Sequence, residues 1–148
     1  MSDVRVRPAT AGDFDAWLPL WRGYQAFYRV DIADAVTRET WRRFHDAGEP
    51  MHCTLAELDG RVAGLVHFVE HRSCWTTGNY LYLQDLFTDA TLRARGIGRA
   101  LIEHVYAQAR ARGCARVHWL THETNVTAMQ LYDRIAERSG FVQYRKVI

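Results

Sequence analysis

The chain has 148 residues, of which 48% are apolar and 24% charged, and its formal net charge is +2. These values predict one ordinary folded domain over residues 1–148 and exclude a disordered chain, and the balanced charge gives no reason to expect nucleic-acid binding. With three cysteines, no CxxC pair, no apolar leader and no membrane-length apolar run, we expect a cytoplasmic protein that makes no membrane contact.

The chain begins with a predicted strand and a predicted helix. Residues 4–9, "VRVRPA", alternate with period two as a half-buried strand does. Residues 10–28 then carry apolar side chains at helical spacing, with Thr10 as the N-cap. Pro19 lies inside this segment and is expected to end or kink the helix.

A second helix and a hairpin are predicted next. Thr37 precedes a short amphipathic segment that has Gly48 near its end. In residues 52–70 two strand-like runs flank Asp59-Gly60, a pair that favours tight turns between antiparallel strands. The first part of the chain therefore predicts antiparallel pairing.

The second half predicts strands and helices in alternation. In order, the elements are a strand at 79–88, a helix from about 97 to 112, a strand at 115–122, a helix at 125–140 and a last strand at 141–148. Gly113 and Gly140 are expected where the two helices end. The complete order β-α-α-β-β-β-α-β-α-β predicts a mixed sheet with helices on its faces, of the α/β or α+β class.

The stretch "LRARGIGRALIEHV", residues 92–105, places Gly96 and Gly98 where a helix begins. A helix start offers unpaired N–H groups, and glycine lets a phosphate approach the backbone closely. The alternative is a glycine-permitted turn with solvated arginines. A nucleotide-hydrolase loop is excluded because no Gly-Lys-Ser/Thr follows, and Leu101 replaces the third glycine of a dinucleotide motif.

Asn125 and Tyr132 form a second constellation. Seven residues separate them, which returns both to nearly one helix face, about 10 Å apart along the axis. An elongated ligand can contact both; alternatively, Asn125 only caps the helix and Tyr132 packs in the core. The histidines of "HFVEH" and "HWLTH" lie about 13 Å apart in strands, too far for one metal ion, so no metal is expected.

These motifs together resemble the GCN5-related N-acetyltransferases (GNAT). "RARGIGRA" fits that family's Arg/Gln-x-x-Gly-x-Gly/Ala signature, and "YLYLQDLFT", "HWLTHETN" and "NVTAMQLY" followed by "SGF" lie where the family has them. The resemblance is nearest to the branch with the diamine/polyamine and yeast histone/polyamine acetyltransferases. It implies a mixed central sheet flanked by about four helices.

The resemblance also implies acetyl-CoA as cofactor and a small primary amine, such as a polyamine or an amino acid derivative, as acceptor. It assigns two catalytic groups: the Leu86 N–H, which bonds the thioester carbonyl, and Tyr132, which protonates the departing thiolate. The cofactor-binding residues that it implies are Leu86, Phe87, Thr88, Arg93, Ala94, Arg95, Gly96, Ile97, Gly98, Arg99, Ala100, Asn125 and Tyr132.

The sequence does not decide which group removes the amine's proton. The resemblance to the polyamine branch implies a glutamate at the position where this chain has Gln84, and an amide is no base. Asp85 follows, but in a regular strand its side chain points to the opposite face. The alternatives are Glu70, His67, His122 and Glu123, of which Glu123 is favoured.

The acceptor side is expected to combine aromatic and acidic side chains, which suit a cationic amine. The candidate substrate-binding residues are Tyr24, Tyr28, Asp31, Asp34, Trp75, Tyr82, Gln84 and Glu123. Since the family has a further strand after the last one predicted here, we expect an open sheet edge and a homodimer. The competing interpretations are a non-catalytic acyl-CoA sensor with the same fold and a transferase for longer acyl groups.

Overall fold

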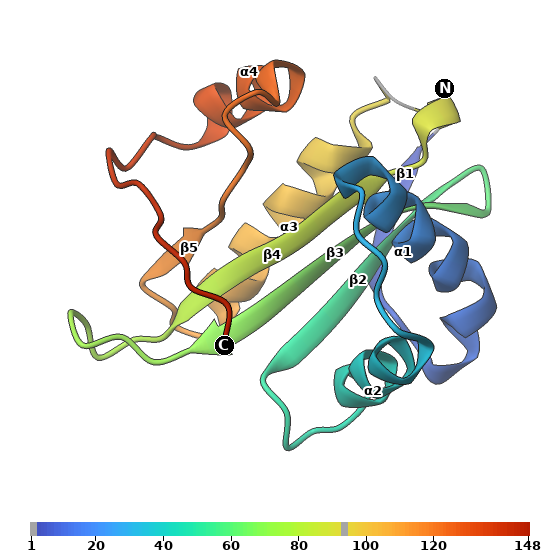
Figure 1. Cartoon of the computed structure of the whole chain (residues 1–148), viewed down its shortest axis with the longest axis horizontal. Helices are drawn as coiled ribbons and strands as arrows, with labels where there is room; N and C mark the ends of the chain where they lie inside the picture. Colours follow the sequence, from blue (N-terminus) through green and yellow to red (C-terminus); the bar gives the residue numbers. More distant parts are fainter. Residues whose placement is uncertain (1–2, 93–94) are drawn as a thin grey trace.

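A computed structural model of the chain describes residues 3–92 and 95–148 (Figure 1). Its elements are β1 (Val4–Pro8), the 3-10 turn η1 (Ala11–Asp13), α1 (Phe14–Tyr28), α2 (Asp34–Phe44), β2 (Met51–Leu58), β3 (Arg61–His71), β4 (Tyr80–Thr88), η2 (Ala90–Leu92), α3 (Ile97–Ala111), β5 (Arg116–His118) and α4 (Val126–Ile135). The predicted order is thus confirmed through the last helix.

One sheet of five strands in the order β1-β2-β3-β4-β5 forms the centre of the molecule. The first four strands pair antiparallel, and β5 runs parallel to β4 because α3 carries the chain back along the sheet. Asp59 and Gly60 have φ angles of 53° and 76°, the left-handed values of the hairpin turn that their sequence predicts.

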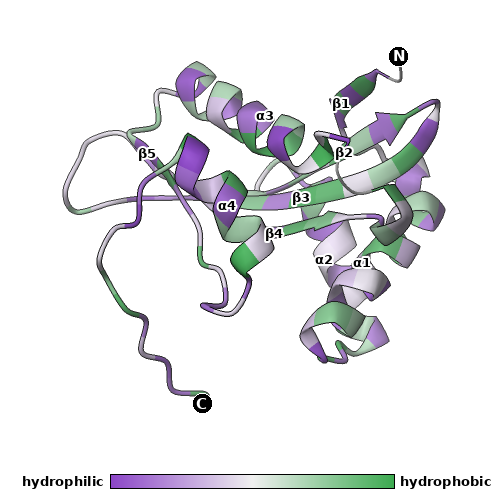
Figure 2. Ribbon diagram, turned by 90° about the horizontal axis from the view of Figure 1, so that it is seen from above, coloured by the Kyte–Doolittle hydropathy of each residue, from purple (hydrophilic) through white to green (hydrophobic). Residues whose placement is uncertain are grey.

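Helices cover both faces of the sheet, α3 on one and α1 with α2 on the other (Figure 2). The predicted apolar stripe of α3 is buried: Ile97, Leu101, Val105 and Ala109 pack with β2, β3 and β4 side chains in one core cluster. A Cβ at Gly64 would lie 2.8 Å from an Ile97 methyl group, so this glycine lets α3 approach β3 closely. The predicted mixed α/β class is confirmed.

The first helix follows the predicted cap but not the predicted break. The Thr10 N–H donates to the Asp13 carboxylate at 2.7 Å, and this turn leads directly into α1. The helix continues through Pro19, so the expectation that it ends there is wrong. Pro19 is the sixth residue of α1, where it removes one hydrogen bond near the start and the buried Trp17, Leu20 and Trp21 still anchor the helix.

Three predicted boundaries are wrong. The second helix begins at Asp34 instead of after Thr37, which is a buried residue inside it, because the Val36 and Thr37 N–H groups both donate to the Ala33 carbonyl. The last helix ends at Ile135, five residues before Gly140. The strand predicted at 115–122 keeps only Arg116–His118, since the chain then leaves the sheet toward α4.

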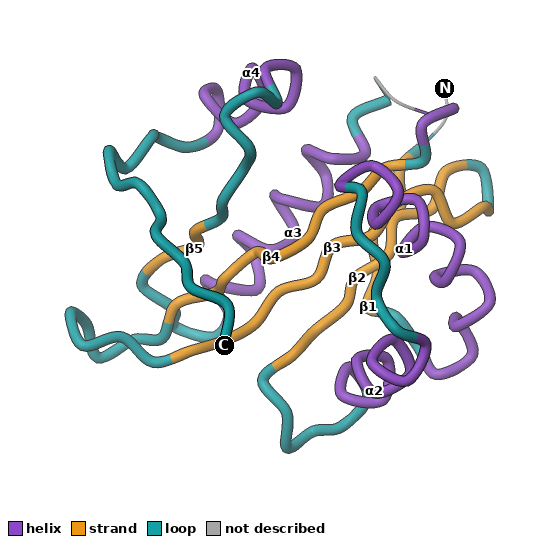
Figure 3. The backbone as a smooth tube through the Cα atoms, in the orientation of Figure 1, coloured by secondary structure: helices purple, strands orange, loops and turns teal. Residues whose placement is uncertain are grey.

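The predicted last strand, residues 141–148, is also absent. Figure 3 shows this segment as a loop that crosses in front of β5, and every one of its residues is exposed. A strand needs a neighbour to pair with, and β5 offers an edge of three residues. The sequence of 141–148 has β-forming residues, but these residues do not supply the neighbouring strand with which they would have to pair. In the described part of the chain, no helix has the length and apolar character of a membrane span.

Candidate active site

The two central strands separate halfway along their length. The parallel pairing of β4 with β5 ends at Tyr82 and His118, whereas β4 continues to Thr88. Within the described residues, the edge of β4 from 83 to 88 therefore has no neighbouring strand. We call this segment the open edge of β4; an extended ligand can pair with it as a further strand would.

The open edge presents the backbone N–H of Leu86. The Asp89 N–H donates to the Ala63 carbonyl of β3 at 2.8 Å. Because successive N–H groups of a strand point to opposite sides, those of Leu86 and Thr88 point away from β3. The geometry thus leaves the predicted donor, Leu86, directed into the gap beside β4.

The glycine turn lies at one end of this gap. Gly96 has a φ of 77° and caps α3, and a Cβ at Gly98 would lie 4.0 Å from the Thr88 hydroxyl oxygen and 3.9 Å from a Leu131 methyl group of α4. The end of the open edge, the start of α3 and α4 therefore meet at Gly98. Of the remaining predicted residues here, Arg93 and Ala94 lie outside the described residues.

The first N–H groups of α3 are available to an anion. Those of Ile97, Gly98 and Arg99 have no acceptor within the helix, as in any first helical turn. The Ala100 N–H already donates to the Gly96 carbonyl at 3.0 Å, so of the predicted donors this one is engaged in the helix. Arg95 and Arg99 are exposed at the same turn.

Asn125 lies at the start of α4, and Tyr132 lies three residues before its end. Asn125 is the N-cap, its carbonyl accepts from the Met129 N–H, and its side-chain amide is 3.4 Å from the Thr121 hydroxyl. Tyr132 packs edge-to-face on Trp119 with ring centroids 5.4 Å apart. Burial, with a smaller contribution from Tyr28, raises the pKa of Tyr132 to about 12, so its phenol stays protonated at neutral pH.

A β-bulge at Gln84 shows that the direction predicted for the Asp85 side chain is wrong. In the ladder with β3, His67 faces Asp85 but the next residue, Phe68, faces Leu83, so Gln84 is an extra residue. The bulge turns Asp85 to the α1 face of the sheet, whereas a regular strand would keep it on the α3 face with Leu83. Gln84 itself is exposed.

Asp85 is the end of a buried hydrogen-bonded relay. The Trp17 indole N–H donates to His67 Nε2 at 3.0 Å, and His67 Nδ1 lies 2.9 Å from Asp85 Oδ2. Trp17 is completely buried, and His67 and Asp85 are only 3% and 9% exposed. The relay links α1, β3 and β4 at the bulge; we use the name Trp17–His67–Asp85 relay below.

Three of the predicted acceptor residues gather around Asp85. Burial raises the pKa of Tyr24, and the charge of Asp85 and a hydrogen bond to it raise it further. The pKa values of Tyr28 and Tyr82 also lie above the usual value, first through burial and then through Asp85. These phenols therefore remain neutral beside the carboxylate, and the rings of Tyr24 and Tyr28 are 4.8 Å apart.

The structure does not bring the other predicted acceptor residues to this cluster. Asp31 and Asp34 line a separate hollow of about 520 Å³ between the end of α1 and the start of α2. Trp75 is 73% exposed and lies over Arg116, at a cavity of about 840 Å³ between β5, α4 and the C-terminal segment. Glu123, the favoured base, is exposed.

Two further candidate bases are engaged elsewhere. Glu70 accepts from Asn79 and Arg112, and His122 bonds the Thr124 hydroxyl two residues away. Among the described residues, three or more His, Cys, Asp or Glu side chains nowhere converge as a metal site would require. The sequence contains no signal for the relay, because neither the bulge nor the meeting of Trp17 with His67, fifty residues apart, follows from local patterns.

Comparison with known proteins assigns the chain to one family. Residues 17–136 match the acetyltransferase (GNAT) family. The chain belongs to this family. The enzyme is thus an N-acetyltransferase, and the resemblance inferred from the glycine turn and α4 is confirmed; nothing supports the non-catalytic alternative.

Relatives and a solved structure agree with this assignment. The acetyltransferase is 32% identical to the D-amino-acid N-acetyltransferase HPA3 of Saccharomyces cerevisiae over 97% of its own length and 90% of the yeast protein. It is 27% identical to the thialysine N-epsilon-acetyltransferase of Sus scrofa, over 93% and 86% of the two chains. The aminoglycoside acetyltransferase AAC(6')-Iy, solved with a bisubstrate analogue, shares the fold at 18% identity with a TM-score of 0.84, covering 99% and 100% of the chains.

Proposed function

We propose that this enzyme is a single domain, residues 1–148, that transfers the acetyl group of acetyl-CoA directly to a primary amine of a small cationic molecule. One observation supports it above the others: the open edge of β4, the first turn of α3 and α4 meet at Gly98. A strand edge beside a helix N-terminus fits a ligand that is extended at one end and anionic at the other.

Different groups of residues bind the different parts of acetyl-CoA. The N–H groups of Ile97, Gly98 and Arg99 bind the pyrophosphate, and the open edge at Leu86, Phe87 and Thr88 binds the pantetheine arm, which Asn125 contacts from α4. Arg95 adds positive charge, and Arg93, Ala94 and Ala100 complete the set that the family resemblance implies. A Cβ at Gly96 would meet nothing within 4 Å, so this turn has space on its outer side.

When bound, acetyl-CoA supplies a thioester whose carbonyl carbon bonds to the amine nitrogen as its bond to sulfur breaks. The Leu86 N–H stabilises the negative charge that develops on the carbonyl oxygen. The Tyr132 hydroxyl gives its proton to the departing sulfur, and a second proton lost by the nitrogen restores the phenol. A pKa of about 12 keeps Tyr132 in the protonated form that this role requires.

Aromatic rings beside a carboxylate favour a positively charged acceptor. Tyr24, Tyr28 and Tyr82 surround Asp85 on the α1 face, an arrangement that binds ammonium groups by cation–π contact and charge. Relatives named for D-amino acids and thialysine act on small molecules with amino groups. We therefore place amino acid derivatives and short diamines first among the acceptors.

The cofactor half of the proposal is tested with Gly98→Ala. Its Cβ would be in ordinary contact with its neighbours, and alanine favours a helix over glycine, so the thermal midpoint of unfolding should stay or rise. The added methyl group obstructs the phosphate, and the affinity for coenzyme A measured by calorimetry should fall about tenfold or more. An unchanged affinity would remove the glycine turn from the cofactor site.

The chemical half is tested with Tyr132→Phe and a panel of amines. Release of free thiol from acetyl-CoA should occur with cationic primary amines, and kcat should fall about 100-fold or more in the variant while coenzyme A binds as before. Equal turnover by Tyr132→Phe would contradict the role of Tyr132. Absence of turnover with every amine would contradict the proposed function.

We also propose a cytoplasmic homodimer. All three cysteines are free, which agrees with a reducing compartment. The C-terminal segment exposes the apolar side chains of Phe141, Val142, Val147 and Ile148, and β5 has an edge that this segment of a second copy can extend. Light scattering should give a dimer for the full chain and a monomer after removal of residues 141–148; a monomeric full chain would contradict the dimer.

A further inference from the structure

We propose that Asp85 receives the amino group of the acceptor, binding it as an ammonium ion and accepting its proton, and that Trp17 and His67 hold Asp85 in place for this purpose. The inference rests on the proposed function and names the residue that removes the amine's proton, which the sequence did not identify. Asp85 replaces the absent glutamate at position 84, because the bulge brings its side chain to the face where the tyrosines lie.

The relay fixes the protonation of its own members. An indole nitrogen can only donate a hydrogen bond, so His67 Nε2, 3.0 Å from Trp17 Nε1, must be the acceptor and carry no proton. The proton of the neutral ring is then on Nδ1, which donates to Asp85 Oδ2 at 2.9 Å. An imidazolium would place the Nε2–H and the indole N–H against each other, so the hydrogen bonds of the relay require a neutral His67 ring.

Asp85 has capacity left for a substrate. A carboxylate accepts about four hydrogen bonds. Among the described residues, His67 and Tyr24 are the donors that reach it. The titratable groups that face Asp85 from the surrounding elements are Tyr24 and Tyr28 of α1, Cys53 of β2, His67 of β3 and Tyr82 of β4.

The facing groups supply no positive charge that would compete with an ammonium ion. Tyr24, Tyr28, Tyr82 and Cys53 are neutral acids whose pKa values lie above their usual values, and the relay holds His67 neutral. A buried carboxylate without a cationic partner is costly, which makes the site attractive to a cation. Leu86, the predicted oxyanion donor, is the next residue along β4, so the amine would be held beside the thioester.

The step at Asp85 is one proton transfer. The N–H bond of the bound ammonium breaks, its proton moves to an oxygen of Asp85, and the electron pair stays on nitrogen for attack on the carbonyl carbon. Asp85 later gives the proton to solvent. No bond to His67 or Trp17 forms or breaks, and these two are positioning residues.

The first test is Asp85→Asn, with Asp46→Asn as the matched control. The amide oxygen can still accept from His67 Nδ1, whereas it neither attracts an ammonium ion nor takes its proton. The kcat/KM for the amine should fall at least 100-fold, and calorimetry should show acceptor binding lost while coenzyme A binds as in the wild type. Asp46 is an exposed carboxylate at the end of α2, and its variant should keep full activity.

The second test is Trp17→Phe, which keeps an aromatic ring and removes the indole donor. His67 Nε2 then has no donor to accept from, so the ring is no longer held in the Nδ1–H form that donates to Asp85. The kcat/KM for the amine should therefore fall while coenzyme A binds as in the wild type, and nitrogen NMR should show a single Nδ1–H form of His67 in the wild type and a mixture of ring forms in the variant. A merely structural role would weaken coenzyme A binding as well and leave the nitrogen NMR signals of His67 unchanged.

The outcomes separate the two proposals. A wild-type enzyme that binds no coenzyme A, or acetylates no amine, refutes the proposed function. An active wild type with an equally active Asp85→Asn variant refutes the role of Asp85 alone. Loss of activity in Glu123→Gln but not in Asp85→Asn would return the role to the residue favoured by the sequence.

Discussion

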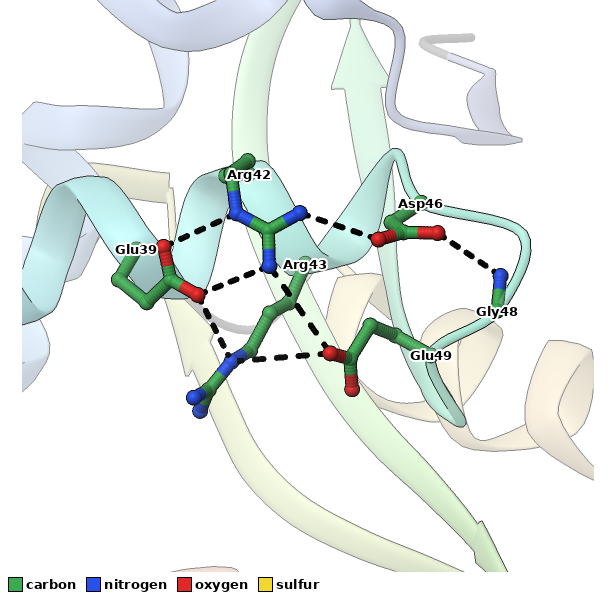
Figure 4. A network of polar contacts seen from close by, with 6 residues as sticks. All are labelled: Glu39, Arg42, Arg43, Asp46, Gly48 and Glu49. Atoms are coloured by element: carbon green, nitrogen blue, oxygen red, sulfur yellow. Dashed lines mark hydrogen bonds and ion pairs between the residues drawn. The ribbon is translucent and has the colours of Figure 1, made fainter.

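Two polar networks in this enzyme have similar bond lengths and different surroundings. In the Trp17–His67–Asp85 relay, His67 and Asp85 are 2.9 Å apart and almost completely buried. On α2, Arg42 lies 2.9 Å from Glu39, but its side chain is 54% exposed. Figure 4 shows this surface network, in which Arg42 and Arg43 connect Glu39, Asp46 and Glu49.

The comparison teaches that burial, more than distance, decides what a polar contact contributes. At the surface, water and salt compete for each partner, and the contact adds little. In the core, a partner that is removed leaves its neighbour without water or a hydrogen bond, which is costly. A buried charge kept in this way needs a reason, and the proposed role of Asp85 in binding the amine supplies one.

The largest effect on stability is expected for His67→Leu. The variant leaves the buried Trp17 N–H without an acceptor and removes the His67 donor from the buried Asp85 carboxylate, so the free energy of unfolding should fall by about 3–5 kcal/mol in a urea titration. The double variant His67→Leu/Asp85→Leu removes the stranded charge and should recover part of that loss. A double variant less stable than the single one would contradict this explanation.

An intermediate effect is expected for Asp13→Asn at the start of α1. Asp13 accepts two hydrogen bonds from Arg7, at 2.7 and 2.9 Å, and one from the Thr10 N–H, and its side chain is 14% exposed. Loss of the charged acceptor should lower the free energy of unfolding by about 1–3 kcal/mol, measured as above. If the free energy of unfolding fell by as much as in His67→Leu, burial would not explain the relative size of the two effects.

The same residue gives a pH dependence. The hydrogen bonds from Arg7 are the largest of the causes that hold the pKa of Asp13 well below its usual value. Its stabilisation is therefore complete above the ordinary pKa, about 4, and is lost as pH falls toward the lower folded-state value. The stability difference between wild type and Asp13→Asn should shrink between about pH 4 and pH 2; a constant difference would point to packing instead.

The smallest effect is expected for Arg42→Ala in the surface network. Although Arg42 contacts Glu39, Asp46 and Glu49, all of these side chains are largely or partly exposed. The midpoint of urea unfolding should not change measurably at physiological salt. A shift comparable to that of Asp13→Asn would show that the network acts as a unit.

Local sequence patterns predicted most of the secondary structure. The hairpin at Asp59-Gly60, the buried stripe of α3 and its end at Gly113, which has a φ of 68°, depend on nearby residues and were confirmed. The candidate cofactor residue Gly98 came from a local motif and Thr88 from the family resemblance, and the structure brings them together. The predicted start of α2 was wrong because Asp34 and Thr37 are both residue types that favour a helix start.

Features that depend on distant neighbours were not predictable. The strand expected at 141–148 needs a partner edge, which β5 with its three residues does not offer within one chain. The bulge at Gln84 arises from the ladder with β3 and reverses the face of Asp85. Reading β4 as a regular strand therefore excluded Asp85, the residue that we propose as the base.

The sequence by itself determined the family, the order of elements through α4 and the glycine turn, because periodicity, turn residues and short motifs act over a few neighbouring positions. Only the tertiary structure decided that Trp17, His67 and Asp85 form one relay. That contact joins a helix and two strands, and its strength comes from the exclusion of water by the packed core around it.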